Sequence, residues 1–201
     1  MRYSILAGLG TLMLVLESGT GQAHFQMLER AGWPVEDRPG DPQRLASCGG
    51  TSANPGIPTN SVTEVRGGDM LHIKLRETIF HPGHYRIALA RSPAALPPDP
   101  EVVTRDTPKG PYSVSAKIAD AKPPILADGL FAHTEKPAPD ALWETDVRIP
   151  NINCDGCTLQ VVQFMSEHGH NKDGDYSYHH CAVLRVTMNP VLPADKAWLG
   201  Q

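Results

Sequence analysis

His24 is the residue with the clearest capacity for chemistry, because the segment before it has the features of an export signal. Residues 1–23 contain Arg2, an apolar run, and small residues at Gly21 and Ala23, the pattern that signal peptidase cleaves. A cut between Ala23 and His24 would leave histidine as the first residue. Its α-amine, which in proteins has a pKa of about 8, and its imidazole could then bind one metal ion together.

A second histidine would complete a three-nitrogen site, and two candidates lie in one short segment. His81 precedes Pro82-Gly83, where the chain enters an apolar, strand-like run, and His84 follows directly after that glycine. One amine nitrogen and two imidazoles form a T-shaped set of ligands that suits Cu(II). We take His81 as the second ligand and His84 as its competitor.

A third group of histidines offers a different kind of site. His168 and His170 lie in a loop that also carries acidic residues. The loop is either an additional metal site or a solvated hairpin loop, and the sequence leaves both interpretations open.

The net charge and the cysteine content limit which partners the protein is expected to bind and in which compartment it is expected to occur. The 18 basic and 22 acidic residues give a net charge of -4, and the basic residues form no run, so we expect no nucleic-acid partner. Four cysteines in an exported chain favour two disulfides over thiol chemistry, although spacing alone does not give their pairing. The Cys154-Asp155-Gly156-Cys157 segment could be redox-active or bind zinc, but a local disulfide is the preferred interpretation.

The elements that must position these residues are short strands. The 19 prolines and 18 glycines interrupt the chain and leave little room for long helices. Strand-like patterns occupy residues 70–75, 85–90, 142–149, 158–164 and 181–187. We expect an antiparallel immunoglobulin/fibronectin-like β-sandwich with long loops. Residues 92–140 are rich in proline and charge, so we interpret them as long surface loops with at most one strand.

The domain organisation follows from the same segments. The apolar run near the N-terminus is shorter than the roughly 20 residues that a membrane span needs, and no second run follows. We therefore expect a signal peptide at 1–23 and a single β-sandwich domain at 24–201, secreted or periplasmic, with no membrane association after cleavage. Glu17, close behind the apolar run, leaves open an earlier cut or an uncleaved anchor.

Taken together, these residues resemble the lytic polysaccharide monooxygenases, copper enzymes that oxidatively cleave chitin, cellulose and related polymers. The shared elements are a mature N-terminal His24, the His81-Pro82-Gly83 stretch leading into a strand, and Tyr178 three residues before Cys181. The resemblance implies one copper ion held by His24 and His81 in a histidine brace. It also implies disulfides between Cys48 and Cys181 and between Cys154 and Cys157.

The resemblance further implies roles for three residues near the copper. Tyr178 would lie on its axial side; the alternative is a core tyrosine beside a disulfide. Fungal members carry a glutamine two residues before that tyrosine, where this chain has Tyr176, and Gln163 is a possible substitute or else a polar residue on a solvated strand face. His179 or His180 is a candidate proton donor, or else caps the strand.

The expected activity is oxidative cleavage of glycosidic bonds in a polysaccharide such as chitin or cellulose. It would require an external electron donor and dioxygen or hydrogen peroxide, and we expect the protein to be a monomer. An alternative is a non-catalytic extracytoplasmic copper-binding protein that handles metal with the same brace. A third interpretation is a structural sandwich that binds no metal.

Overall fold

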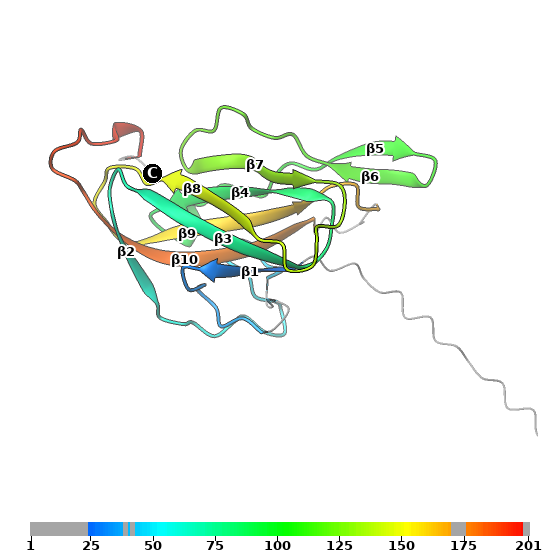
Figure 1. Ribbon diagram of the computed structural model, residues 1–201, viewed down its shortest axis with the longest axis horizontal. Helices are drawn as coiled ribbons and strands as arrows, with labels where there is room; N and C mark the ends of the chain where they lie inside the picture. The colour runs from blue at the N-terminus through cyan, green and yellow to red at the C-terminus, as the bar shows by residue number, and fades with distance from the viewer. Residues whose placement is uncertain (1–23, 38–39, 41–42, 170–175, 199–201) are drawn as a thin grey trace, which may run out of the picture.

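The computed structural model is an all-β sandwich in which two sheets face each other across one apolar core (Figure 1). The structure describes residues 24–37, 40, 43–169 and 176–198. The predicted export signal at 1–23 lies outside these described residues. Among the residues described, no helix is long and apolar enough to cross a bilayer.

The smaller sheet has three strands in the order β1 (His24–Glu29), β3 (Met70–Ile79) and β8 (Trp143–Arg148), all antiparallel. Side chains alternate between its two faces, as a pleated strand requires. On β3, Leu71, Ile73 and Leu75 are buried in the core, and the residues between them are partly exposed. This alternation is the pattern that predicted the strand.

The larger sheet has five strands in the order β2 (Val62–Arg66), β10 (Ser177–Thr187), β9 (Cys154–Met165), β4 (Gly83–Ala90) and β7 (Ile125–His133). Its pairs are antiparallel except β2 with β10, which run parallel. Every residue of β4 is buried. One face of this strand packs into the core, and loop residues cover the other face.

The predicted fold class is confirmed, and each of the five predicted strands corresponds to a strand of the sandwich. The interpretation of residues 92–140 was incomplete, because they contain β5 (Val103–Thr107), β6 (Gly110–Val114) and β7. β5 and β6 form a separate hairpin that projects from the sandwich (Figure 1). β7 pairs with β4 through several register shifts, which interrupt the regular alternation that a sequence pattern detects.

Two disulfides join the cysteines in the pairs that the family resemblance implied. Cys48 is bonded to Cys181 in the middle of β10, and Cys154 is bonded to Cys157 at the start of β9. Between the second pair, Gly156 has a φ of 85° and lies at a register shift opposite β10. The left-handed conformation of this glycine lets the strand bulge, so a local disulfide fits inside a strand.

Candidate metal centre

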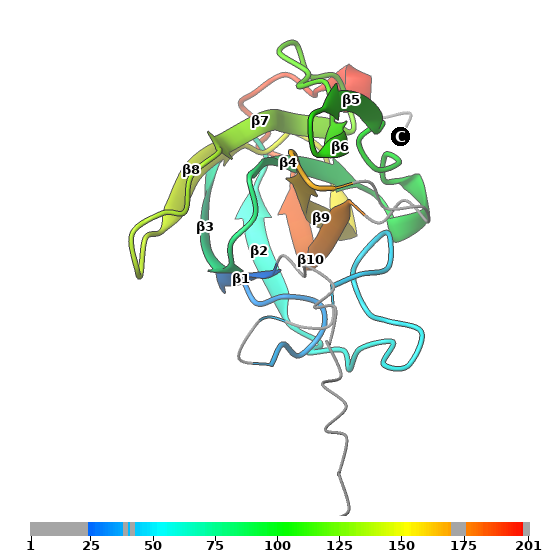
Figure 2. The ribbon, with the colours of Figure 1, turned by 90° about the vertical axis from the view of Figure 1, so that its right-hand side faces the viewer.

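The two histidines predicted as metal ligands lie at one end of the sandwich, the end that faces the viewer in Figure 2. His24 is the first residue of β1 and pairs with Ile79 at the end of β3. His81 follows Ile79 after a single intervening residue. The β1–β3 ladder therefore brings both histidines to the same sheet end, although they are far apart in the sequence.

Tyr178 and Gln163 reach the same end from the larger sheet. They are paired across β10 and β9, and both side chains are buried. The Tyr178 ring lies 5.2 Å from the His24 ring, at a 55° angle between the ring planes. The alternative that Gln163 is a polar residue on a solvated strand face is therefore wrong. Both residues lie on the core side of their strands, next to the first residue of β1.

Glu77 is the residue that connects these elements, and the sequence analysis did not identify it. Its side chain is only 2% exposed. Its Oε1 atom accepts hydrogen bonds from Gln163 Nε2 at 2.7 Å and from the His81 backbone N–H at 3.2 Å. A signal was present, because strand alternation from Leu71 through Leu75 places position 77 on the core face.

His133, at the end of β7, approaches the same carboxylate from the other side. Its Nε2 atom lies 3.3 Å from Glu77 Oε2, and its Nδ1 atom lies 2.8 Å from the Phe131 carbonyl oxygen. Burial alone would lower the pKa of His133, but Glu77 and the Phe131 carbonyl outweigh it and raise that pKa above the ordinary value. Glu77 therefore joins β3, β7 and β9 at the end of the sandwich that holds His81.

His180 lies behind the first residues of β1, fully buried on the core side of β10. Its Nε2 atom is 3.1 Å from the Phe25 carbonyl oxygen, and its Nδ1 atom is 3.2 Å from Glu36 Oε1. Burial lowers the pKa of His180 to about 4 and raises the pKa of Glu36 to about 8. At neutral pH the pair is therefore a neutral imidazole and a protonated carboxyl group, which can donate to Nδ1.

The His81-Pro82-Gly83 turn is fixed to β9 by a close backbone approach. Ser166 N–H donates to the Pro82 carbonyl oxygen at 2.8 Å. A Cβ atom on Gly83 would overlap the carbonyl oxygen of Phe164. Glycine is required here because the two backbones touch, and the turn that carries His81 depends on that contact.

His84, the competing ligand, lies on the opposite face of the larger sheet. It is buried against the Phe164 ring at 5.3 Å, and its Nε2 atom is 3.9 Å from Asp128 Oδ1. Burial lowers the pKa of His84. Because side chains alternate along β4, the sheet separates His84 from the core side that holds Tyr178.

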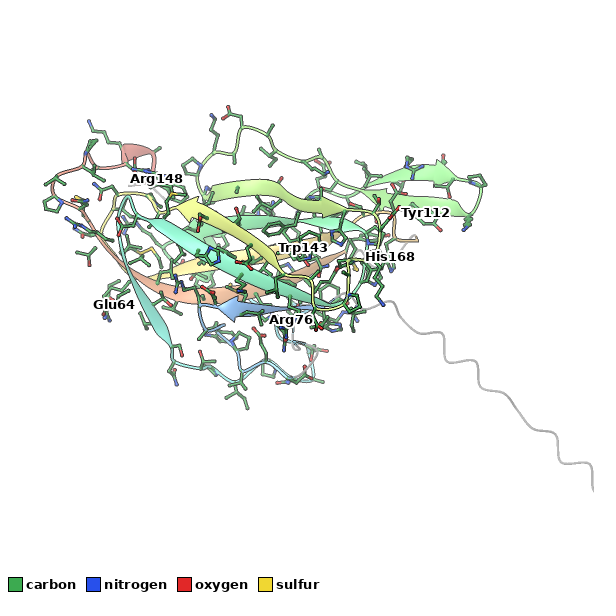
Figure 3. All side chains as sticks on the ribbon, in the orientation of Figure 1. Glu64, Arg76, Tyr112, Trp143, Arg148 and His168 are labelled. Atoms are coloured by element: carbon green, nitrogen blue, oxygen red, sulfur yellow. A yellow bond between two sulfur atoms is a disulfide. The ribbon has the colours of Figure 1, made fainter. Side chains whose placement is uncertain are left out.

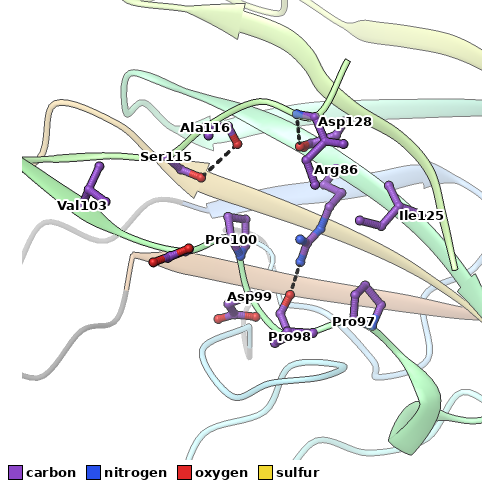
Figure 4. Close-up of a pocket in the computed structure, with 12 residues that line it drawn as sticks. Arg86, Pro97, Pro98, Asp99, Pro100, Val103, Ser115, Ala116, Ile125 and Asp128 are labelled. Atoms are coloured by element: carbon purple, nitrogen blue, oxygen red, sulfur yellow. Dashed lines mark hydrogen bonds between the residues drawn. The ribbon is translucent and has the colours of Figure 1, made fainter. Parts of the chain in front are cut away.

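Other charged residues surround His84 on this outer face, around a pocket of about 430 Å³ (Figure 4). Arg86 Nη2 donates to the Pro98 carbonyl oxygen at 2.6 Å. His179 Nε2 lies 2.7 Å from Asp99 Oδ1. Asp128 accepts from the Ile118 backbone N–H at 2.9 Å. The loop around residues 97–100 covers the outer face of the sheet through the contacts of Pro98 and Asp99.

The third group of histidines lies partly beside the predicted ligands. The His168 ring is 5.3 Å from the His81 ring, whereas His170 lies outside the described residues. Among the residues described, no three His, Cys, Asp or Glu side chains gather into a metal site.

No protein-family model matches the chain. No curated protein matches its sequence. Among solved structures, the chain is similar to a lytic polysaccharide monooxygenase of family AA15 from Thermobia domestica, determined in the Cu(I) state, with 16% identity and a TM-score of 0.40. The alignment covers 66% of each chain, so this chain spans just under two thirds of that protein.

Proposed function

We propose that the exported protein binds one copper ion through the α-amine and ring of His24 and the ring of His81, and that it is a polysaccharide monooxygenase. The observation that carries the proposal is the placement of His24, His81 and Tyr178 at one end of the sandwich. His24 opens β1 there, so cleavage before it would put the new α-amine at that end of the sheet.

The donor set suits copper in both type and number. An α-amine and two neutral imidazoles are the ligands that favour Cu(II) among the divalent metals. His81 fits the set better than His84, because His84 lies on the far side of the larger sheet from Tyr178. The two disulfides support an exported protein, since such bonds persist in oxidising compartments.

The chain's own residues would shape the surroundings of the metal. When bound, copper supplies one-electron redox chemistry with dioxygen or hydrogen peroxide, driven by an external electron donor. Tyr178, whose ring lies against that of His24, would limit access to the metal by a further strong ligand. Glu77 holds the backbone of His81 and the amide of Gln163 in place. His180 binds the Phe25 carbonyl, which fixes the strand residue next to His24.

Gln163 has one side-chain atom that is available for the reaction. Its Nε2 atom donates to Glu77, whereas its buried Oε1 atom has no hydrogen-bond partner among the described residues. An acceptor in this position can orient a protonated group at the site. We assign Gln163 this role, and we assign His180 a positioning role, because both of its ring nitrogens already face Phe25 and Glu36.

The test is the electron paramagnetic resonance spectrum of protein that begins at His24, loaded with one equivalent of Cu(II). We expect an axial signal with three nitrogen ligands that is lost in His81→Ala and retained in His84→Ala. Oxidised oligosaccharides, released from a polymer only with copper and a reductant, would establish the monooxygenase. A spectrum of loosely bound copper would refute the brace.

A second function is favoured by one observation, the short distance between the His81 and His168 rings. An additional imidazole beside the brace would help a protein that binds or delivers copper without catalysis. In that case the three-nitrogen signal would be present, but no oxidised product would form from chitin, cellulose or hemicelluloses. The two readouts together therefore separate an oxidase from a copper-handling protein.

A further inference from the structure

A pocket of about 600 Å³ lies beside the candidate metal centre, at the end of the smaller sheet. Its wall includes Gln26 of β1, Arg76 and Glu77 of β3, and Phe80, the residue before His81. The segment 136–141, which precedes β8, forms the opposite wall. The pocket thus shares Glu77 with the candidate centre, and Arg76, labelled in Figure 3, precedes Glu77 on β3.

Arg76 is distinguished from its neighbours on the same strand face by the lack of a counter-ion. His72 lies between Asp146 and Glu144 at 2.9 and 3.1 Å, and Lys74 lies 3.4 Å from Glu144. In the part of the chain that the structure describes, Arg76 forms no ion pair, and its buried Nε atom has no hydrogen-bond partner. A half-buried guanidinium normally has such partners, because desolvating an unpaired charge is costly.

The other charges of the pocket do not neutralise Arg76. Lys136 is exposed and forms no ion pair within the described residues. The Glu77 carboxylate is already contacted by Gln163, His133 and the His81 backbone. Asp140 is exposed and forms no ion pair with either cation in the described chain. Two cations that have no counter-ion among the described residues therefore line the cavity beside the carboxylates of Glu77 and Asp140, and the cavity has room for an anionic group.

We infer that this pocket binds the carboxylate of an acidic sugar, so that the polymer acted on is a uronate-containing polysaccharide. The inference rests on the proposed function, because it assigns a substrate class to that centre. The planar guanidinium of Arg76 matches a carboxylate with two parallel hydrogen bonds, and Lys136 adds a second positive charge. Phe80 and the prolines of segment 136–141 supply apolar surface for the sugar ring.

The experiment measures binding of tetragalacturonate to copper-free protein that begins at His24, by isothermal titration calorimetry at low salt. Cellotetraose and chitotetraose are the neutral probes, and a sulfated tetrasaccharide tests a different anion. We expect the uronate oligomer to bind at least about tenfold more tightly than either neutral oligomer, and its affinity to fall with added salt. A guanidinium can also take two hydrogen bonds from a tetrahedral anion, so the inference requires that the sulfated oligomer bind no more tightly than the uronate.

The variants test whether Arg76 provides the recognition. Arg76→Gln should weaken uronate binding about tenfold or more, Arg76→Lys less, and Lys136→Gln about threefold. Lys74→Gln is the matched control, since it removes the same charge two residues along the same strand face, and it should change the affinity less than twofold. Thermal melting of each variant separates a loss of binding from a loss of folding.

Three results would overturn the inference: no binding of the uronate oligomer, equal binding of neutral and acidic oligomers, or unchanged affinity in a folded Arg76→Gln protein. Tighter binding of the sulfated oligomer would overturn it as well. None of these results depends on copper. Uronate binding without oxidised products would refute the monooxygenase alone, whereas oxidation of neutral polymers without uronate binding would refute the substrate class alone.

Discussion

The two faces of the larger sheet each carry a cluster of polar residues, most of them buried, and the clusters differ in their charges. We call the residues on the core side the inner cluster: Glu36, Glu77, His133, Gln163 and His180. Those on the other side are the outer cluster: His84, Arg86, Asp99, Asp128 and His179. The outer cluster includes the fixed positive charge of an arginine, whereas the inner cluster consists of imidazoles, an amide and carboxyl groups.

The comparison shows that buried histidines do not by themselves make a metal site. His84 and His180 are both buried and both have a lowered pKa, so either ring could be a neutral ligand. The inner cluster is distinguished by its position behind His24, the first residue of β1, where the proposed cleavage would add an amine nitrogen. What distinguishes the outer cluster is Arg86, whose charge would repel a metal ion in a region of low dielectric constant.

The largest expected effect separates the two clusters by copper affinity. One glycine added before His24 should raise the dissociation constant for Cu(II) by about 1,000-fold, or roughly 4 kcal/mol, because the chelating amine is lost. His84→Ala, in the outer cluster, should change it less than threefold. Titration with Cu(II) against a competing chelator measures the dissociation constants of both variants. Equal affinities of the extended and unextended proteins would remove the distinction between the clusters.

A smaller effect is expected from the carboxylates that support each cluster. Glu77→Gln should weaken copper binding about 10- to 100-fold, because residues that orient a metal ligand have effects of this size. Asp128→Asn is the control, since it removes the same charge from the outer cluster without a contact to His81. If Asp128→Asn weakened copper binding as much as Glu77→Gln, the effect would be one of general stability.

The inner cluster should also determine how stability responds to alkaline pH. Glu36 has a pKa of about 8 in the fold against 4.5 ordinarily, so the folded protein binds more protons than the unfolded chain between these values. Stability should therefore fall as the pH rises through this range. His180 opposes the trend mainly below pH 6.5, where the unfolded chain is protonated at this residue and its lowered pKa in the fold makes stability rise with pH.

The informative window is therefore pH 6.5 to 8. Across it, we expect the free energy of unfolding to decrease by on the order of 1 kcal/mol, measured by urea denaturation. Glu36→Gln should remove most of the slope in this window, and the remainder would come from His133, whose pKa is also raised in the fold. A wild-type protein with flat stability from pH 6.5 to 8 would show that Glu36 is ionised in the fold.

The outer cluster should respond to acid instead. Burial alone would raise the pKa of Asp99, but the hydrogen bond and charge of His179 and the charge of Arg86 outweigh it and lower that pKa. This stabilisation is present above the ordinary pKa of 3.8 and is lost as the pH falls through the folded value. Because Asp99 is partly exposed, Asp99→Asn should cost about 1 kcal/mol or less at neutral pH and leave the copper spectrum unchanged.

The sequence predicted those parts of the molecule that depend on local patterns. Alternation identified the strands that line the core, and the residues around His81 indicated a turn into β4. The disulfide pairs and the place of Tyr178 came from the family resemblance, because neither follows from local spacing. The fold class was therefore predictable from short-range information and one set of motifs.

The parts that were missed depend on contacts between distant segments. Glu77 acquires its importance from Gln163 and His133, which lie in other strands. Alternation along the strand indicated that position 77 faces the core, but it did not reveal these partners. Burial raises the pKa of Glu36, and the sequence does not reveal that this loop residue is buried. β7 was hidden because register shifts break its alternation.

Gly83 has a consequence for how relatives of this protein are recognised. The glycine is required by the contact of β4 with β9, whether or not the preceding turn carries a metal ligand. Sandwiches that have exchanged the histidine for another residue should therefore keep the glycine. A search of genomes with a histidine-x-glycine motif would combine a glycine that is kept for strand packing with a histidine that is kept for metal binding. Only the histidine, together with a cleavable leader that ends directly before another histidine, would identify proteins able to hold copper.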